Sequence, residues 1–173
     1  MTSARIATMG LVVAGTVAAL VLFQGCPSRP RSAPDFALPD LSGRVIRMRD
    51  LRGKVVVLNL WTTWCPPCVQ EMPTLERLHG EMSDEDLVVL AVSQDEKPDL
   101  VRPWIEKRAF TFPVLLDPLA ETGHALGVSG YPETFVVDRQ GTIVHHHIGY
   151  RDWAEPQVLG AFRKLLETGK WTL

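Results

Sequence analysis

Residues 55–68 read VVVLNLWTTWCPPC, and the predicted fold is built around this stretch. Its first part, Val55 to Leu60, is an apolar run, interrupted only by Asn59 and without alternation, which is typical of a strand buried on both faces of a sheet. Its last part, Cys65-Pro66-Pro67-Cys68, opens a helical pattern. We therefore expect Cys65 at the point where a central strand ends and a helix begins.

This position gives the two cysteines different chemical roles. The free amides and the dipole at a helix N-terminus favour an anion, so Cys65 is predicted to be the attacking thiolate. Cys68, one turn further along, is predicted to resolve the mixed disulfide, which makes the pair a two-electron switch. Pro66 and Pro67 remove two amide hydrogens from this turn. We therefore expect the pKa of Cys65 to be that of a mildly reducing pair rather than of a strong oxidant.

Two other interpretations of the cysteine pair are disfavoured. A structural zinc site needs two more ligands at matched spacing, and the only other cysteine, Cys26, lies in the N-terminal segment. A purely structural disulfide between Cys65 and Cys68 would restrain the unfolded chain little, because the loop is so short. We expect no metal and no cofactor other than the redox-active disulfide itself.

Residues 1–26 are typical of an export signal or a membrane anchor. Arg5 precedes an uncharged apolar run from Ile6 to Phe23. The run ends in LFQGC at residues 22–26, which resembles the lipobox of bacterial lipoproteins and implies lipidation at Cys26. A lipoprotein, an uncleaved anchor helix and a cleaved signal stay open as alternatives. We expect an exported, membrane-tethered protein that faces the periplasm or the cell exterior.

The remaining residues predict a linker and one folded domain. Residues 27–34 contain three prolines and no apolar periodicity, so we interpret them as a semi-rigid linker. The domain is expected over residues 35–173. The whole chain has 46% hydrophobic residues, which is ordinary for a globular protein. Its formal charge of −2 argues against a nucleic-acid partner. After the central strand we expect helices at 66–80 (kinked at Pro73), 98–109, 120–126 and 154–167, and strands at 87–92, 112–116, 134–137 and 142–148.

Strands that alternate with helices, between an N-terminal β-hairpin at 36–48 and a terminal hairpin and helix, predict an α/β sandwich around a mixed sheet. These elements, with the Trp-Cys-x-x-Cys motif at the first helix, resemble the thioredoxin fold. The closer resemblance is to membrane-tethered thiol-disulfide reductases of the TlpA, ResA and DsbE (cytochrome c maturation) type. It covers Asp35 to about Gly169 and rests on Asp35-Phe36, residues 58–68, Glu71-Met72-Pro73 and residues 127–141.

The resemblance implies a substrate groove beside Cys65. In it, Pro132 is the cis-proline opposite Cys65, Tyr131 lines the groove and Trp64 is the exposed tryptophan at its rim. Proline has no amide to bond Cys65, while the backbone of Tyr131 remains free to pair with an extended substrate strand.

The resemblance also indicates which carboxylate handles protons. Asn59 stands where thioredoxin itself has a buried carboxylate, and an amide cannot act as a general base. Glu71, one helical turn after Cys68, matches the active-site glutamate of the resembling family. Glu133, beside Pro132, is a second candidate and a candidate substrate contact. Each of the two glutamates could instead be a solvated surface charge.

We therefore predict an extracytoplasmic thiol-disulfide oxidoreductase that works mainly as a reductase. The resemblance suggests a membrane-embedded thiol electron donor, and protein disulfide substrates such as apocytochrome c or copper-site cysteines. One alternative is a copper-binding assembly protein that uses Cys65, Cys68 and a histidine of residues 145–147, although His145 and His147 face one way on a strand and His146 the other. Another alternative is a thiol peroxidase, because Thr62 stands three residues before Cys65. Leu58, however, occupies the place of a proline in that motif.

Overall fold

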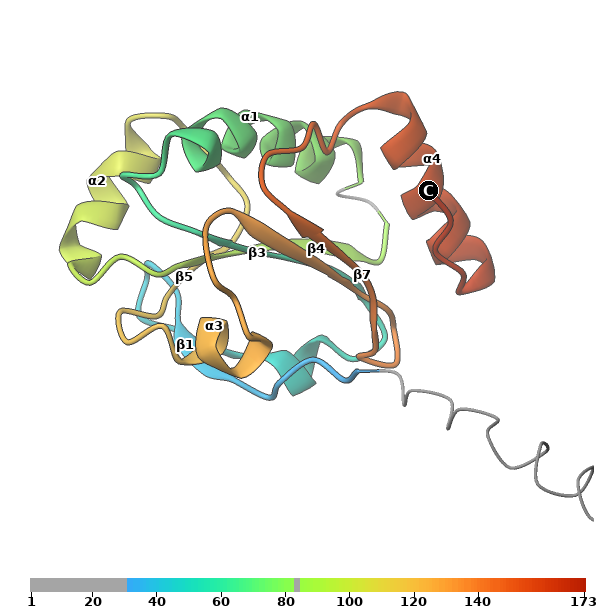
Figure 1. Ribbon diagram of the computed structural model, residues 1–173, viewed down its shortest axis with the longest axis horizontal. Helices are drawn as coiled ribbons and strands as arrows, with labels where there is room; N and C mark the ends of the chain where they lie inside the picture. Colours follow the sequence, from blue (N-terminus) through green and yellow to red (C-terminus); the bar gives the residue numbers. More distant parts are fainter. Residues whose placement is uncertain (1–30, 83–84) are drawn as a thin grey trace, which may run out of the picture.

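The computed structural model describes residues 31–82 and 85–173, so the expectations for the export segment and for Cys26 lie outside the described residues. Its main sheet is mixed and has the strand order β5-β4-β3-β6-β7 (Figure 1). Strands β3, β4 and β5 are parallel, and β6 and β7 run antiparallel to their neighbours. The strands are β3 (Val55–Trp61), β4 (Leu87–Ser93), β5 (Val114–Leu116), β6 (Glu133–Val137) and β7 (Ile143–Ile148).

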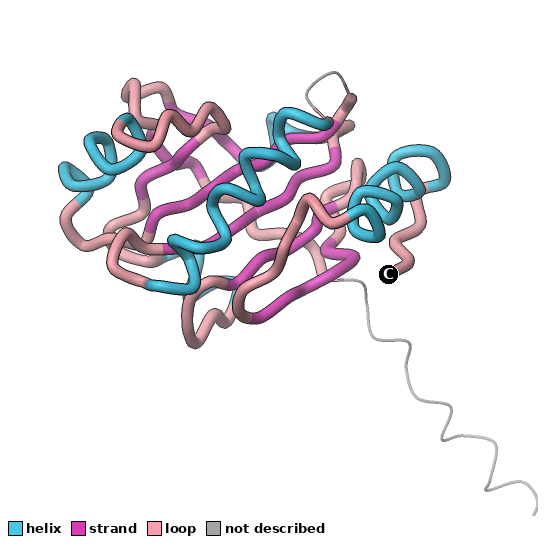
Figure 2. Tube along the Cα trace, turned by 90° about the horizontal axis from the view of Figure 1, so that it is seen from above, coloured by secondary structure: helices cyan, strands magenta, loops and turns pink. Residues whose placement is uncertain are grey.

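Helices cover both faces of this sheet, which confirms the predicted thioredoxin-like sandwich (Figures 1 and 2). A small antiparallel hairpin, β1 (Ala37–Pro39) with β2 (Val45–Arg47), precedes the main sheet in the chain, as expected. The short 3₁₀ turn η1 (Met48–Leu51) leads from it into β3. The α-helices are α1 (Pro66–Glu81), α2 (Val101–Glu106), which follows the 3₁₀ turn η2 (Pro98–Leu100), α3 (Glu121–Leu126) and α4 (Pro156–Thr168).

The central strand β3 divides the hydrophobic core into two layers because its side chains alternate between the faces of the sheet. Val55, Val57 and Trp61 pack in one layer, together with buried residues of α1, α2 and α4. Val56, Leu58 and Leu60 pack in the other layer, where α3 contributes Leu126. Every residue of β3 is buried, the polar Asn59 included, as expected for a strand covered on both faces.

All four α-helices differ from their predicted ranges, and the second differs most. The helix expected over 98–109 is α-helical only over Val101–Glu106, because Arg108 and Ala109 donate to carbonyls three residues back and Ala109 has a positive φ of 54°. Helix α1 continues as one element through Pro73 to Glu81.

The folded part begins earlier than expected, inside the stretch interpreted as a linker. Ala33 is buried, its N–H donates to the carbonyl of Gly141, and the carbonyl of Arg31 accepts from Ile143 N–H. The proline-rich composition concealed this pairing, because a segment that adds to a sheet edge needs only backbone groups. Since Leu60 pairs with Glu133 and the β6–β7 turn lies at the far end of both strands, residues 31–33 join the domain at the end of the sheet opposite Cys65.

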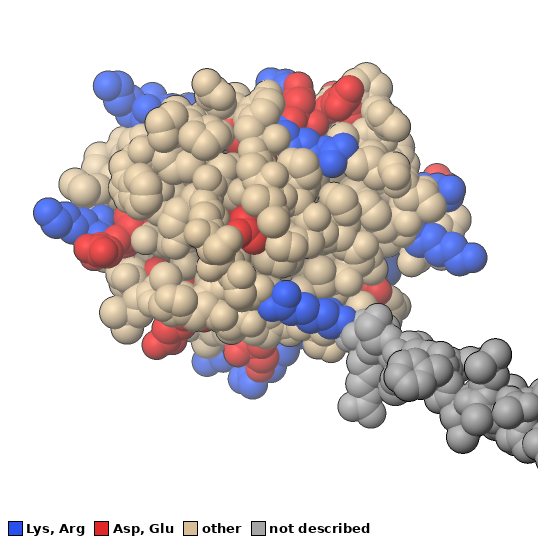
Figure 3. All heavy atoms as spheres, in the orientation of Figure 1, with Lys and Arg blue, Asp and Glu red and all other residues tan. Residues whose placement is uncertain are grey.

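Charged side chains are dispersed on the surface. On the face in Figure 3, basic and acidic residues lie interspersed around the rim, and most of the centre is uncharged. Within residues 31–82 and 85–173, no helix has both the length and the apolar character needed to cross a membrane.

Candidate active site

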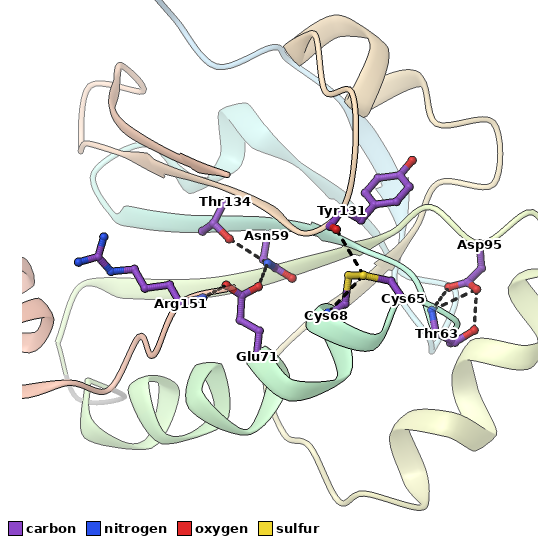
Figure 4. Close-up of a disulfide and its surroundings, with 9 residues drawn as sticks. All are labelled: Asn59, Thr63, Cys65, Cys68, Glu71, Asp95, Tyr131, Thr134 and Arg151. Atoms are coloured by element: carbon purple, nitrogen blue, oxygen red, sulfur yellow. Dashed lines mark hydrogen bonds between the residues drawn. A yellow bond between two sulfur atoms is a disulfide. The ribbon is translucent and has the colours of Figure 1, made fainter. Parts of the chain in front are cut away.

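Cys65 and Cys68 form a disulfide at the start of α1, with their Cα atoms 5.2 Å apart (Figure 4). Cys65 is the N-cap of the helix, as its place after the apolar run predicted. Its Sγ accepts from the backbone N–H of Cys68 at 3.2 Å. Pro66 and Pro67 fill the first two helical positions and have no amide hydrogen, so the thiolate of Cys65 would meet a weaker field of donors than a helix N-terminus usually provides.

Both cysteines are buried in the oxidised pair. Cys65 is 4% exposed and Cys68 is 1% exposed, and both belong to the same core layer as α1. Trp64, directly before Cys65, is 70% exposed. Cys65 is therefore the cysteine next to the exposed surface, and the attacking and resolving roles stay predictions from the sequence.

The peptide bond between Tyr131 and Pro132 is cis, as the resemblance implied. The carbonyl oxygen of Tyr131 lies 3.4 Å from Cys65 Sγ, so the Pro132 turn faces the reactive sulfur (Figure 4). The ring of Tyr131 lies edge-on to that of Trp64, with their centroids 6.3 Å apart. These two aromatic residues form one rim of the site.

A hollow of about 670 Å³ opens beside this rim. Trp64 and Tyr131 line it on the side of the cysteines, and Leu100 and Leu119 line it from the segments after β4 and β5. Leu119 is 71% exposed, so its apolar surface has little cover within the chain. The structure thus brings Trp64 and Tyr131 together at the edge of a hollow and adds Leu100 and Leu119, which the sequence had not singled out, while the role of Trp64 and Tyr131 in substrate binding stays a prediction.

Asp95 fixes the turn that carries Trp64. Its buried carboxylate accepts from Thr63 N–H at 3.0 Å and from Thr63 Oγ1 at 2.6 Å (Figure 4). It also accepts from Ser93 Oγ at 2.8 Å. Ser93 and Asp95 follow β4, whereas Thr63 follows β3, and the two strands are parallel neighbours. The link holds the loop before Cys65 against the adjacent strand end, a role that no local pattern in the sequence indicated.

Glu71 is 1% exposed, so the interpretation as a solvated surface charge does not hold. Its carboxyl accepts from Trp153 Nε1 at 2.7 Å, Asn59 Nδ2 at 2.9 Å and the backbone N–H of Arg151 at 3.2 Å. Burial raises the pKa of Glu71 to about 7, against the opposing effect of these hydrogen bonds, of which the one from Trp153 is the largest. A carboxyl with a pKa near neutrality can both accept and return a proton at physiological pH.

Glu133 is also buried, at 1% exposure, so neither a solvated charge nor a direct substrate contact fits its position. Its carboxylate accepts from Ser129 N–H at 3.1 Å and lies 2.7 Å from His146 Nε2. Its side chain thus links the segment before Pro132 to β7. Glu133 supports the Pro132 turn from within the fold, and its burial disagrees with the expected direct contact with a substrate.

The histidine run lies on β7 as alternation predicts. His145 and His147 face one side with ring centroids 6.4 Å apart, and His146 stacks on Phe135 on the other side. Across the residues that the structure describes, no three His, Cys, Asp or Glu side chains lie close enough together to hold a metal ion.

Comparisons with known proteins agree with this geometry. The model of the AhpC/TSA family matches residues 30–146 of the chain. The thiol-disulfide oxidoreductase ResA of Halalkalibacterium halodurans is 37% identical over 117 residues, which are 68% of this chain and 66% of that protein. The chain thus spans about two thirds of the length of this curated relative.

Solved structures give the same result. A structure from Chlorobium tepidum that carries the name thiol:disulfide interchange protein DsbE has a TM-score of 0.69 and 32% identity, and the match covers 78% of this chain and 92% of that one. The exposed lipoprotein thioredoxin Etrx1 of Streptococcus pneumoniae has a TM-score of 0.64 and 29% identity, with 73% and 98% covered. From its fold, its cysteine pair and these relatives, the chain belongs to the AhpC/TSA family and, within it, to the thioredoxin-like thiol-disulfide oxidoreductases related to ResA and DsbE.

Proposed function

We propose that this oxidoreductase acts outside the cytoplasm and works mainly as a reductase of protein disulfides. The observation that carries this proposal is the cysteine pair itself: Cys65 caps α1 next to Trp64, which lines an open hollow of mixed apolar and charged residues, while Cys68 is buried one turn further along the helix. The single amide donor to Cys65 Sγ supports the reducing direction, because weak stabilisation of the thiolate leaves the dithiol a better electron donor.

The reaction proceeds in two exchange steps. The Cys65 thiolate attacks one sulfur of the substrate disulfide, forms a mixed disulfide and releases the other substrate sulfur as a thiolate. Cys68 then attacks Cys65, its thiol proton passes to the Glu71 carboxylate, and the second substrate thiol leaves. The substrate gains two electrons from the cysteine pair, one proton from Cys68 by way of Glu71 and a second proton from solvent, and Cys65 and Cys68 end as a disulfide. A dithiol donor must then reduce this pair again.

The partners follow from the tethered state that the N-terminal residues predict. A membrane-embedded thiol carrier is the proposed donor, and exported proteins with oxidised cysteines, such as apocytochrome c or copper-site proteins, are the proposed substrates. The lipoprotein named among the similar structures supports lipidation at Cys26 as the form of the tether.

The test is the reduction potential of the Cys65/Cys68 pair, measured by equilibration of the full-length chain with glutathione and dithiothreitol buffers. A value close to that of thioredoxin, about −270 mV, or modestly above it is expected for a reductase. A value near −120 mV, typical of a strong oxidant, would reverse the proposed direction. Rapid peroxide consumption, or tight Cu(I) binding lost in a His147→Ala variant, would favour the peroxidase or the copper-binding alternative.

A further inference from the structure

The two oxygens of the buried Glu71 carboxyl have different surroundings. Oε1 accepts from two donors that have no acceptor function of their own, the indole N–H of Trp153 and the backbone N–H of Arg151. Oε2 accepts from one donor, the side-chain amide of Asn59. Protonation of Oε1 would therefore place a hydrogen against two donors, whereas protonation of Oε2 disturbs only one.

The amide on Oε2 can also accept a proton. Asn59 Nδ2 bridges Glu71 and Thr134 Oγ1, and its Oδ1 is buried without a hydrogen-bond partner among the described residues. If the Asn59 amide flips by rotation about its last side-chain bond, Oδ1 takes the place of Nδ2. Oδ1 then accepts from a protonated Glu71 Oε2, and the Thr134 hydroxyl rotates to donate to the same Oδ1. Asn59 can thus serve both protonation states of Oε2, which the donors on Oε1 cannot do.

The donors on Oε1 come from a segment that is attached to the same helix as Glu71. The backbone N–H of Trp153 donates to Thr74 Oγ1 at 3.2 Å, and the same oxygen lies 3.2 Å from the carbonyl oxygen of Arg151. Asp152 pairs with Arg77 at 3.0 Å. Residues 151–153 are therefore held on α1 at several points, and the fully buried indole of Trp153 reaches Glu71 from a fixed base.

We propose that Trp153 is a positioning residue for proton transfer: its indole N–H holds Glu71 Oε1, so that Oε2, on the side of Asn59, gains and loses the proton of Cys68. The proposal rests on the proposed function, in which Glu71 accepts that proton. Trp153 lies beyond residue 146, where the family match ends, so the match assigns it no role.

The surroundings of Glu71 contain few other groups that titrate. Cys68 precedes it by one turn on α1, and β3 and β6 contribute the neutral Asn59 and Thr134. The guanidinium of Arg151 lies 5.7 Å from the ring of Trp153, and the ring of His147 lies 5.9 Å from it. Because the hydrogen bond from Trp153 lowers the pKa of Glu71, its loss should raise that pKa.

The experiment uses the full-length chain with ¹³C-labelled glutamate, in which NMR follows the Glu71 carboxyl as a function of pH. Trp153→Phe keeps an aromatic ring but removes the donor, so the Glu71 midpoint is expected to rise by about one pH unit. The midpoint of the pH–rate profile for disulfide exchange should rise with it. Trp61→Phe is the matched control: Trp61 is equally buried, its Nε1 has no hydrogen-bond partner in the described chain, and its loss should leave the Glu71 midpoint unchanged.

A second measurement needs no change at Trp153. In the unaltered chain, the ¹⁵N–¹H signal of the Trp153 indole should titrate with the same midpoint as the Glu71 carboxyl, and Glu71→Gln should abolish that titration. An indole signal that ignores pH, or equal shifts in the two tryptophan variants, would overturn the positioning role. The potential of the Cys65/Cys68 pair, measured on the same sample, tests the proposed function separately. If the reduction potential is that of a reductase but the Trp153 indole signal does not titrate, only the role of Trp153 is rejected and the proposed function stands.

Discussion

At the scale of single residues, the chemistry depends on polar groups that the fold removes from water. Cys65 and Cys68 could be singled out from their own short motif, whereas the roles expected for Glu71 and Pro132 came from the resemblance to a known family. Their partners could not be predicted in this way, because Trp153 is 82 residues from Glu71 in the sequence. Only the tertiary structure brings such pairs together, and no local pattern marks them in advance.

Substitution of Glu71 by Gln should flatten the pH dependence of disulfide exchange. Glu71 has a pKa raised to about 7 by burial, so its carboxylate fraction, and with it the rate of Cys68 deprotonation, rises between pH 6 and 8 in the unaltered chain. Gln keeps a carbonyl oxygen for the Trp153 and Arg151 donors but does not titrate. Stopped-flow exchange with a disulfide-linked peptide measures the profile, and an unchanged pH profile would remove Glu71 from the mechanism.

The same residue should make folding stability depend on pH. Since its pKa is raised in the folded state, from 4.5 to about 7, folding binds a proton between these values. Its contribution to stability is complete below pH 4.5 and is lost as pH rises through 7, by at most about 3 kcal/mol. The free energy of unfolding in urea should differ less between pH 5 and pH 8 in the Glu71→Gln variant than in the unaltered chain. Equal differences in both proteins would show that burial does not raise the pKa of this carboxyl.

At the scale of elements, apolar runs predicted the strands well because most strands of the main sheet are buried. β3 extends one residue beyond its predicted end, and β4 does the same. Helix ends and the start of the domain were less predictable, since they depend on backbone hydrogen bonds rather than on side-chain pattern. The pairing of residues 31–33 with the β6–β7 turn is the clearest example, because these residues lie between two prolines, Pro30 and Pro34, in a stretch whose composition is also typical of linkers.

Removal of residues 31–34 should therefore destabilise the domain, although they were interpreted as part of a linker. A chain that starts at Asp35 loses two backbone hydrogen bonds between the segment and the turn, the burial of Ala33 and the contact of the Arg31 guanidinium with the end of α3. We expect a loss of about 1–3 kcal/mol relative to a chain that starts at Arg31. Urea midpoints of the two fragments measure this, and identical midpoints would show that the segment adds nothing to stability.

At the scale of the whole molecule, the proposed tether should matter for recharging rather than for chemistry. Deletion of residues 27–30 shortens the stretch between the predicted anchor and the domain, so reduction of Cys65–Cys68 by the membrane-embedded donor should slow several-fold, while reduction by dithiothreitol should not change. Restoring the length with four Gly and Ser residues should recover the rate. Redox-state trapping with a thiol-alkylating reagent in membrane vesicles gives the measurement, and equal rates for all three chains would contradict the predicted tether.

The place where the chain enters the domain also determines which way the domain points. Residues 31–33 join it at one end of the sheet, and Cys65 stands at the other, across a seven-residue strand that spans roughly 20 Å. A molecule anchored through its N-terminus therefore presents its reactive sulfur outward, toward soluble substrates. To accept electrons from a partner inside the bilayer, the domain must rotate so that Cys65 faces the membrane. Under the proposed tether, reduction by that partner and delivery to soluble substrates would use two opposite orientations of the domain.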